Sequence, residues 1–296
     1  MFESTRLGEG RVNPLSPGSQ IGRFRLEALL GSGGMGSVWA AADLTASDAR
    51  VALKILHPSM ALRADARRRL LREAEAANLI RHPGVIAARE VLEVDGRSVL
   101  VMDLLAGETL RSLLDREGQL EFSRAARILA EVASVLGTAH GAGVVHRDLK
   151  PENVFLASSS GPGEAVKVLD FGVAKLLFAP GDAGQALTKL GTLLGTVAYM
   201  APEQVTGASS VDASADVWAL GAVLYEALSG CRPFEGETQN EMIRRLLTEA
   251  VTPIAVLTPN LPEELQRLLA KMLSRAPERR TGMAEVETIL TRYAAP

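Results

Sequence analysis

Residues 146–153 read His146-Arg147-Asp148-Leu149-Lys150-Pro151-Glu152-Asn153. The stretch holds a carboxylate at Asp148, an ammonium group at Lys150 and an amide at Asn153. A carboxylate can accept a hydroxyl proton, an ammonium group can neutralise a phosphate, and carboxylate and amide oxygens can ligate a hard metal ion. Because a solvated surface loop rarely gathers these three groups within six residues, the stretch predicts a functional site.

Two shorter strings follow this stretch. Asp170-Phe171-Gly172 supplies a second carboxylate suited to a divalent metal ion. Ala201-Pro202-Glu203 comes later in the chain. The order of the three strings strengthens the prediction of a functional site.

A glycine-rich segment lies upstream. It matches the pattern G-x-G-x-x-G-x-V with the residues Gly31, Ser32, Gly33, Gly34, Met35, Gly36, Ser37 and Val38. Glycine has no Cβ, so the backbone of such a hairpin can approach phosphate oxygens closely. The pattern alone also fits an ordinary hairpin turn. It does not fit a dinucleotide-binding fingerprint, because a strand and not a helix follows the glycines.

The next strand-like run contains Val51-Ala52-Leu53-Lys54. With a period of two, Ala52 and Lys54 share one face, opposite Val51, Leu53 and Ile55. That face suits a flat adenine ring beside the small Ala52 and phosphate groups beside the ammonium of Lys54. The alternative is an edge-strand lysine that points into solvent.

Hydrophobic periodicity divides the chain into a β part and a helical part. Strand-like runs cover 24–30, 37–43, 50–56 and 85–101, and a helical stretch covers 64–80. Further helical patterns cover 122–140, 214–229, 238–250, 261–273 and 283–293, with short strands or loops at 144–156 and 166–170. Residues 1–20 lack periodicity and predict a flexible N-terminal tail, and residues 179–186 predict a loop.

The composition is that of a globular protein. Its 296 residues are 47% hydrophobic and 23% charged, which excludes disordered and collagen-like chains. The net charge of −3 is too small to imply a nucleic-acid or acidic-membrane partner. The single Cys231 cannot form an internal disulfide, and the sequence predicts neither a signal peptide nor a transmembrane segment. We therefore expect a cytoplasmic protein, or the part of a longer protein that lies outside the membrane.

Together these motifs resemble the protein kinase family over about residues 24–293, and Gly33-Gly34-Met35-Gly36 is similar to bacterial serine/threonine kinases of eukaryotic type. Further positions that fit the family are Glu73, residues 216–221, Arg232-Pro233-Phe234, and Arg280, which is expected to pair with Glu203. The resemblance implies an α+β, bilobal kinase fold. A small antiparallel β lobe with one main helix would span residues 21–101, a hinge 102–107, and a larger, mostly α-helical lobe 108–293.

The resemblance also implies catalytic roles for four residues. Lys54, held by Glu73, would bind the α- and β-phosphates of ATP. Asp148 would accept or orient the proton of the substrate hydroxyl, and Lys150 would steady the γ-phosphate. These roles fit phosphoryl transfer, which needs positioning and charge neutralisation more than covalent help.

Further residues are implied in binding the nucleotide and the metal. Asn153 and Asp170 would hold Mg²⁺ or Mn²⁺. The adenine would lie against apolar side chains and bond to the backbone of residues 103–105. The implied ATP-binding residues are Leu30, Gly31, Ser32, Gly33, Gly34, Met35, Gly36, Ser37, Val38, Ala52, Lys54, Met102 (the gatekeeper), Asp103 and Leu105.

Lys150 and the Gly195-Thr196 pair resemble kinases that phosphorylate serine and threonine in proteins. We expect self-phosphorylation on Thr188 or Thr192, between two copies of a homodimer, with the phosphate paired to Arg147. Thr196 is expected to bond to the catalytic loop instead. The alternatives are a catalytically inactive kinase-fold scaffold or signalling module, and a small-molecule kinase. The complete set of motif residues disfavours the scaffold, and the Ala-Pro-Glu segment disfavours the small-molecule kinase.

Overall fold

The structure, a computed structural model, describes residues 15–33, 36–47, 49–57, 64–158, 164–171, 197–207 and 211–294, with the backbone alone for 64–69. The chain divides into two compact units. One is drawn from residues 1–68 and 89–104, and the other from residues 69–88 and 105–296. The first is built on a β-sheet and the second is mostly helical.

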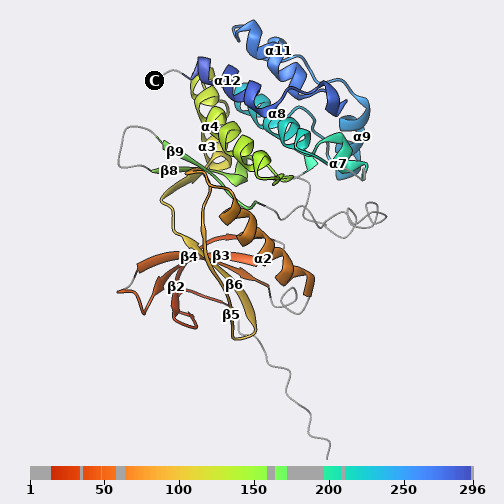
Figure 1. Cartoon of the computed structure of the whole chain (residues 1–296). Helices are drawn as coiled ribbons and strands as arrows, with labels where there is room; N and C mark the ends of the chain where they lie inside the picture. The colour runs from red at the N-terminus through yellow and green to blue at the C-terminus, as the bar shows by residue number, and fades with distance from the viewer. Residues whose placement is uncertain are drawn as a thin grey trace, which may run out of the picture. The chain divides into compact units, whose positions relative to one another are not determined.

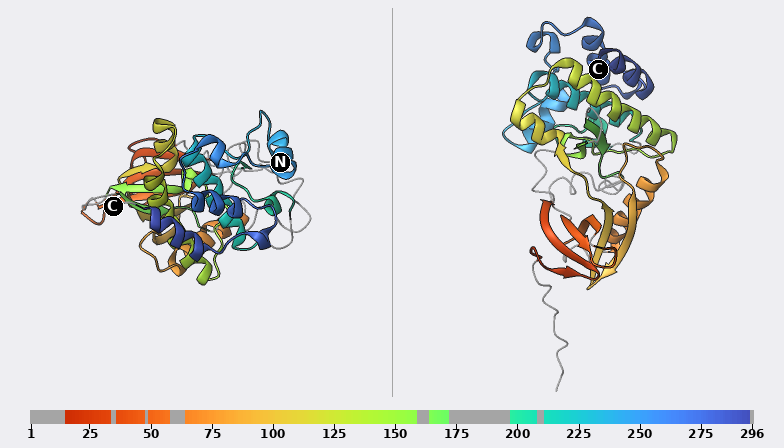
Figure 2. Two further views of the ribbon diagram at one scale, coloured as in Figure 1. Left: turned by 90° about the horizontal axis from the view of Figure 1, so that it is seen from above. Right: turned by 90° about the vertical axis from the view of Figure 1, so that its left-hand side faces the viewer.

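The sheet of the first unit has the strand order β1-β2-β3-β4-β6-β5 (Figures 1 and 2). Its strands are β1 (Gln20–Ile21), β2 (Phe24–Ser32), β3 (Gly36–Asp43), β4 (Ala49–Leu56), β5 (Ala88–Val94) and β6 (Arg97–Asp103). The pairs β1–β2, β2–β3, β3–β4 and β4–β6 are antiparallel. Alternate apolar side chains gather on one face as the core of this unit, namely Phe24, Leu26, Trp39, Ala41, Val51, Leu53, Ile55, Val99 and Val101. The predicted strand-like runs are confirmed.

The last residues of the expected tail belong to this sheet. The Gly18 amide donates to the Leu26 carbonyl at 2.8 Å, and the Leu26 amide donates to the Ser19 carbonyl at 2.9 Å. Leu15 packs against the core of the unit. The folded domain therefore begins before residue 20, because these backbone groups extend the pairing along β2. Residues 1–14 lie outside the described residues.

Helix α2 (Ala64–Leu79) confirms the helix predicted over 64–80. From residue 69 onward its contacts group it with the helical unit, whereas the sequence assigned it to the β lobe. The grouping reflects apolar packing, because Ile80 lies in the core of the helical unit and Ala76 and Val85 pack against that core. The amide of Val168 also donates to the carbonyl of Gly84 at 2.8 Å.

The helical unit contains β7 (Gly107–Thr109), α3 (Leu110–Glu117), α4 (Phe122–Gly141), η1 (Pro151–Asn153), β8 (Val154–Ser158), β9 (Glu164–Val168), α7 (Pro202–Val205), α8 (Ser214–Ser229), α9 (Gln239–Thr248), α10 (Ile254–Leu257), α11 (Glu263–Met272), η3 (Pro277–Arg279) and α12 (Met283–Tyr293). The helices predicted over the longer periodic stretches are confirmed within three residues at each end. Helix α4 packs against both α8 and α12 (Figure 1). None of the helices in the described part of the chain combines the length and the apolar character that crossing a bilayer requires.

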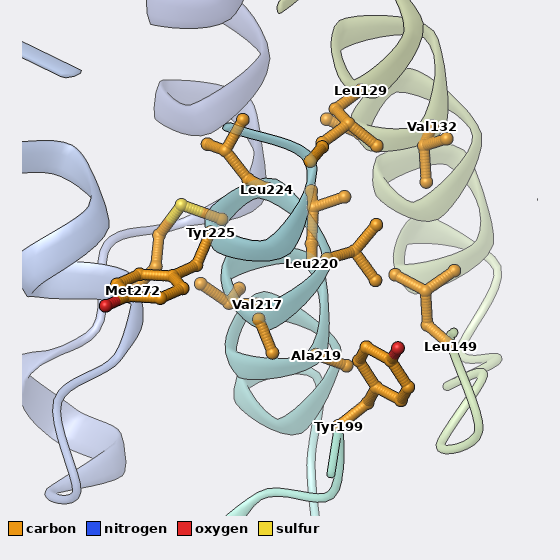
Figure 3. Close-up of a cluster of buried hydrophobic side chains, with 14 of the residues drawn as sticks. Leu129, Val132, Leu149, Tyr199, Val217, Ala219, Leu220, Leu224, Tyr225 and Met272 are labelled. Carbon is orange, nitrogen blue, oxygen red and sulfur yellow. The ribbon is translucent and has the colours of Figure 1, made fainter. Parts of the chain in front are cut away.

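Helix α8 is the centre of the helical core. Residues 215–228 of this helix are all buried, which explains why its sequence is apolar all round. Its side chains, among them Leu220 and Leu224, pack with Leu129 of α4 and Met272 of α11 (Figure 3). Leu149 of the 146–153 stretch joins the same cluster, so the core anchors the segment that carries Asp148.

Candidate active site

The small sheet β7-β8-β9 explains how Asn153 and Asp170 come close although they are distant in sequence. In the antiparallel β8–β9 pair, Val154 lies opposite Val168. Asn153 precedes β8 and Asp170 follows β9, so both emerge at one end of the pair. The Leu169 amide donates to the Asn153 carbonyl at 2.8 Å and extends the pairing by one residue.

Asp148, Lys150 and Asn153 form one hydrogen-bonded cluster. The Lys150 ammonium donates to Asp148 Oδ2 at 2.9 Å. The Asn153 Nδ2 donates to the Asp148 carbonyl at 2.7 Å and approaches Asp148 Oδ2 at 3.5 Å. Asn153 is buried, while the side chains of Asp148 and Lys150 are 24% and 19% exposed. Because Nδ2 is bound to Asp148, Oδ1 is the Asn153 atom with the chemistry to ligate a cation.

His146 connects this cluster to the Asp170 segment. The Asp148 amide donates to His146 Nδ1 at 3.2 Å, so Nδ1 carries no proton and Nε2 carries one. That Nε2 lies 2.8 Å from the Leu169 carbonyl, to which it donates. The imidazole is fully buried and meets the ring of Phe171 edge-on, with centroids 4.8 Å apart. The imidazole thus binds the backbone of Asp148 itself and that of Leu169, the residue before Asp170.

Two residues of this region have a left-handed backbone. Arg147 has φ 65° and Asp170 has φ 59°. Residues other than glycine rarely adopt this backbone conformation, which costs them about 1–2 kcal/mol. Contacts with neighbouring residues must therefore stabilise it. The Arg147 amide donates to Asp216 Oδ1 at 2.8 Å, and the Gln204 Nε2 donates to the Arg147 carbonyl at 2.8 Å. Both backbone groups of Arg147 are thus bound to side chains remote in sequence.

Asp216 is fully buried and accepts two further hydrogen bonds. They come from the His146 amide and from His140 Nε2, each at 2.8 Å. Asp216 was predicted only as part of a run that fits the family, and not as a residue of the site. A signal was present: Asp216 and Glu226 are the only charged residues of the apolar helix α8. A charge in a buried helix needs partners.

The Ala201-Pro202-Glu203 segment is tied to the rest of the unit by an ion pair and a glutamine. Arg280 Nη1 and Nη2 donate to Glu203 Oε1 and Oε2 at 2.5 and 2.8 Å, which confirms the predicted pair. The Arg280 side chain is completely buried and also donates to the carbonyls of Ser214 and Ser274. Gln204 Oε1 accepts from the Ala201 amide at 2.9 Å, so this side chain joins the segment to Arg147. Gln204 was not predicted.

Tyr199, just before this segment, donates to Glu226 Oε2 at 2.5 Å. Arg111 Nη1 donates to Glu226 Oε1 at 2.9 Å, and the guanidinium of Arg232 lies 6.0 Å from the centre of the Tyr199 ring. Burial, together with the adjacent Glu226 carboxylate, raises the pKa of Tyr199 well above its usual range. The hydroxyl therefore stays a donor to Glu226 at all ordinary pH values.

In the β unit, the shared face predicted for Ala52 and Lys54 is confirmed. Lys54 pairs across the sheet with Val38 on β3 and with Leu100 on β6. Ala52 pairs likewise with Ala40 and Met102, so Met102 joins this face. Residues directly opposite each other share a face of the sheet. The intervening side chains lie in the core on the other face.

Lys54 and Glu73 are both buried, on β4 and α2. Their expected pairing stays a prediction. Leu105 belongs to the helical unit, and Leu30 lies at a register shift of β2 and is 54% exposed. The Asp103 carboxylate binds Arg89 at 2.6 Å. The expected contact of the Asp103 backbone with adenine stays a prediction.

The glycines of the 31–38 segment differ in how closely other atoms of the chain approach them. A Cβ on Gly36 would lie 2.2 Å from the Ile55 carbonyl oxygen, so the approach of β3 to β4 requires glycine there. A Cβ on Gly31 or Gly33 would meet no described atom within 4 Å. Packing among the described residues therefore leaves open space at these two glycines, as a backbone that receives phosphates needs. Gly34 and Met35 lie outside the described residues.

The Ser37 side chain does not join the Lys54 face. Ser37 pairs with Ile55, a core residue, and its hydroxyl accepts from the Trp39 indole at 2.8 Å. Any contact of Ser37 with a nucleotide would therefore fall to its backbone.

Within the described residues, no three His, Cys, Asp or Glu side chains gather as a ready-made metal site. The donors at hand are the amide oxygen of Asn153 and the carboxylate of Asp170. They fit Mg²⁺, which usually keeps several waters and is bound by one or two protein oxygens together with substrate phosphates.

Comparison with known proteins agrees with this geometry. Residues 24–289 match the protein kinase domain family. The chain is 39% identical over 266 residues to the serine/threonine-protein kinase pkn3 of Myxococcus xanthus, which covers 89% of this chain and 48% of that protein. It is 40% identical over 273 residues to the serine/threonine-protein kinase PkaB of Streptomyces coelicolor, covering 90% and 62%. The chain thus spans about half the length of these curated relatives.

Among solved structures, the Mycobacterium tuberculosis PknI kinase domain superimposes with a TM-score of 0.69 at 27% identity, covering 95% of this chain and all of that one. The predicted kinase fold is confirmed by this match and by the antiparallel sheet and helical unit described above. The chain belongs to the protein kinase domain family.

Proposed function

We propose that the chain transfers the γ-phosphate of ATP to serine and threonine hydroxyls of proteins. The observation that carries the proposal is the hydrogen-bonded cluster of Asp148, Lys150 and Asn153, with the Asp170 segment bound to it through Leu169. The similar bacterial proteins pkn3 and PkaB, both named serine/threonine-protein kinases, support the same choice of acceptor.

In the proposed reaction, the acceptor hydroxyl oxygen bonds to the γ-phosphorus while the bond to the bridging β–γ oxygen breaks. The hydroxyl proton passes to the Asp148 carboxylate, which the Lys150 ammonium holds in place at 2.9 Å. Lys150 also places a positive charge where the transferred phosphoryl group would pass. ADP is the leaving group. Such a reaction depends on alignment and charge neutralisation.

The face of the sheet that carries Lys54 is proposed to bind the nucleotide. Val38, Ala52 and Met102 supply apolar surface for adenine, and Lys54 supplies the charge for the α- and β-phosphates, with Glu73 as its partner. The open glycines Gly31 and Gly33 would let the backbone approach the phosphates.

Mg²⁺ or Mn²⁺ would be held by Asn153 Oδ1 and the Asp170 carboxylate, and would neutralise charge on the phosphate oxygens. Asp170→Asn is expected to weaken nucleotide binding measured with Mg²⁺ much more than binding measured without it. Calorimetric titration under both conditions tests this role. Equal losses under both conditions would contradict it.

The choice of acceptor has its own test. The protein is incubated with Mg-ATP and a mixture of peptides that carry serine, threonine or tyrosine, and the products are separated by phosphoamino acid. Phosphoserine and phosphothreonine are expected. Transfer mainly to tyrosine would overturn the choice of acceptor, and no transfer to any peptide would favour an inactive scaffold.

Self-phosphorylation between two copies of the chain is part of the proposal. The candidate acceptors Thr188 and Thr192 lie outside the described residues, as does Thr196. Support comes from Arg147: its Nη2 donates to the Val211 carbonyl at 2.9 Å, while its buried Nε finds no partner among the described residues. A phosphate would bring a charge of about −1.5 to −2 to this guanidinium.

Mass spectrometry after incubation with Mg-ATP should find phosphate on Thr188 or Thr192, and none in Asp148→Asn. The initial rate should rise with the square of protein concentration if two copies react. A rate that is linear in concentration would contradict transfer between copies. Full activity of an unmodified Thr188→Ala, Thr192→Ala protein would contradict a role in regulation.

A further inference from the structure

Two side-chain hydrogen bonds hold the strands that flank the glycine pattern, here called the glycine stem (residues 31–33 and 36–39). On one strand, the imidazole Nε2 of His57 lies 2.9 Å from the Gly33 carbonyl oxygen. On the other, the indole Nε1 of Trp39 donates to the Ser37 hydroxyl at 2.8 Å. The stem is also closed by a backbone bond of 2.9 Å from the Gly33 amide to the Gly36 carbonyl.

The contact of His57 with Gly33 has a defined direction. A carbonyl oxygen only accepts, so His57 Nε2 must carry a proton and donate it. Both the neutral ring with its proton on Nε2 and the charged ring satisfy this, so the bond does not need a charged histidine. His57 follows β4 directly, three residues after Lys54. The bond therefore ties the stem to the end of the strand that carries the lysine.

The position of His57 shows that its action on a nucleotide would be indirect. Ser37 and Trp39 lie on the core side of β3, and Ser37 pairs with Ile55 of β4. Side chains alternate along an extended chain, so residue 57 continues the side of Ile55, opposite that of Lys54 and Val38. Both side-chain bonds thus support the stem from behind, away from the face proposed to bind the nucleotide.

The Gly33 strand is held by backbone pairing with β3 and by His57, whereas the space around its glycines is open. A Cβ placed on Gly31 or Gly33 meets no described atom within 4 Å, and the β2–β3 register shifts between Leu29 and Gly31. Glycine loses more conformational entropy than any other residue when its backbone is fixed. A bond that fixes it beforehand lowers the cost of binding a ligand there.

We propose that His57 is a positioning residue for ATP, which holds the Gly33 strand of the glycine stem in the conformation that receives the phosphates. The inference rests on the proposed function for the identity of the ligand. It assigns His57 an effect on nucleotide affinity and none on the transfer step, because the imidazole touches no reacting atom.

The test compares four proteins: wild type, His57→Ala, His57→Gln and the control Arg50→Ala. Glutamine can place an amide N–H close to the position of His Nε2 and can restore the bond. Arg50 lies on the same strand β4 and makes an exposed ion pair with Glu27, remote from the stem. Arg50→Ala therefore controls for the removal of a long side chain next to the same strand. Calorimetry with Mg²⁺ and a non-hydrolysable ATP analogue gives the affinity of each protein.

His57→Ala is expected to weaken binding about three- to ten-fold, the equivalent of one hydrogen bond, while His57→Gln and Arg50→Ala stay within about two-fold of wild type. The KM for ATP should rise by the same factor with kcat unchanged. The Gly33 amide should exchange its hydrogen faster in His57→Ala in the absence of nucleotide, at an unchanged melting temperature.

Unchanged affinity and unchanged Gly33 exchange in His57→Ala would overturn the proposal. Equal weakening in the alanine and glutamine variants, or a lowered melting temperature in both, would also overturn it, because His57 would then have only a structural role. If wild type transfers no phosphate, the proposed function fails, whereas the Gly33 exchange rates and the analogue affinities still decide the role of His57.

Discussion

The backbone amide of Arg147 donates to the buried carboxylate of Asp216 at 2.8 Å, across 69 residues of sequence. This bond holds a left-handed backbone at Arg147, directly before Asp148. The position of the proposed catalytic carboxylate therefore depends on an acid buried in helix α8 as well as on the local sequence.

Asp216→Asn is expected to lower both stability and turnover. The amide keeps one acceptor oxygen, so one of the two backbone N–H groups of His146 and Arg147 loses its partner. Leaving a buried donor unpaired costs about 1–3 kcal/mol. Urea unfolding should show this loss, and kcat should fall more than KM changes. Asp212→Asn, which can still accept from the Ser214 amide at the start of α8, is the matched control and should stay within about 0.5 kcal/mol of wild type. An Asp216→Asn protein as stable and as fast as wild type would contradict the account.

Gln204 allows its effects on turnover and on stability to be separated, because its Oε1 accepts from the Ala201 amide and its Nε2 donates to the Arg147 carbonyl. Gln204→Glu can still accept from the Ala201 amide but cannot donate to the Arg147 carbonyl. We expect kcat to fall several-fold with a stability loss of about 1–2 kcal/mol, and Gln204→Ala to lose more stability because both partners are left unpaired. Gln266 of α11 donates to the Leu261 carbonyl, and Gln266→Ala, which removes that donor, should leave kcat unchanged. Steady-state kinetics and urea unfolding measure both effects. Equal kcat in wild type and Gln204→Glu would remove Gln204 from the site.

The Glu203–Arg280 pair should dominate the stability of its region. Glu203→Ala leaves the fully buried Arg280 guanidinium without its carboxylate, which costs about 3–5 kcal/mol. Glu263→Ala breaks an exposed ion pair with Arg267 and should cost less than about 1 kcal/mol. Denaturant unfolding of both variants gives the comparison. Similar losses in the two variants would contradict a special role for the buried pair.

We expect the free energy of unfolding to depend on pH in the alkaline range because of Tyr199. Its pKa is raised in the folded protein by burial and by Glu226, while the unfolded chain keeps the ordinary value of 10.0. The stabilisation is therefore complete below pH 10 and is lost as the pH rises from there through the folded pKa. Tyr199→Phe should cost about 1 kcal/mol at neutral pH through the lost bond to Glu226, and the gap to wild type should narrow above pH 10. Urea unfolding of both proteins between pH 7 and 11 tests this, and a gap that stays constant would contradict it.

Much of the fold followed from periodicity. Helix α8 begins and ends where the pattern placed it, at residues 214 and 229, because long segments average out local irregularities. Helices α7 and α10 have four residues each, too few for a 3.6-residue period to show, and they were missed. Which unit each part of α2 contacts did not follow from periodicity: from residue 69 onward its contacts group it with the helical unit, where Ala76 and the following Ile80 pack.

The site was predictable where its residues are close in sequence or share a strand. Asp148, Lys150 and Asn153 lie within six residues, and the period of two placed Lys54 with Ala52. Bonds from a side chain to a remote backbone group, such as Gln204 to Arg147, leave no spacing pattern and were missed. For Ser37, the motif gave the position but not the side of the strand, and its hydroxyl binds Trp39 on the core side.

We propose that this chain catalyses phosphoryl transfer with Asp148 and Lys54. The most direct measurement is transfer of labelled γ-phosphate from Mg-ATP to a protein acceptor by wild type, Asp148→Asn and Lys54→Met, with the melting temperature of each. Wild type is expected to transfer phosphate, and each variant is expected to lose at least about 100-fold of the rate, because positioning and general-base contributions are lost. The melting temperatures should stay within a few degrees of wild type, because the core is kept. Turnover close to wild type in either folded variant would contradict the proposal.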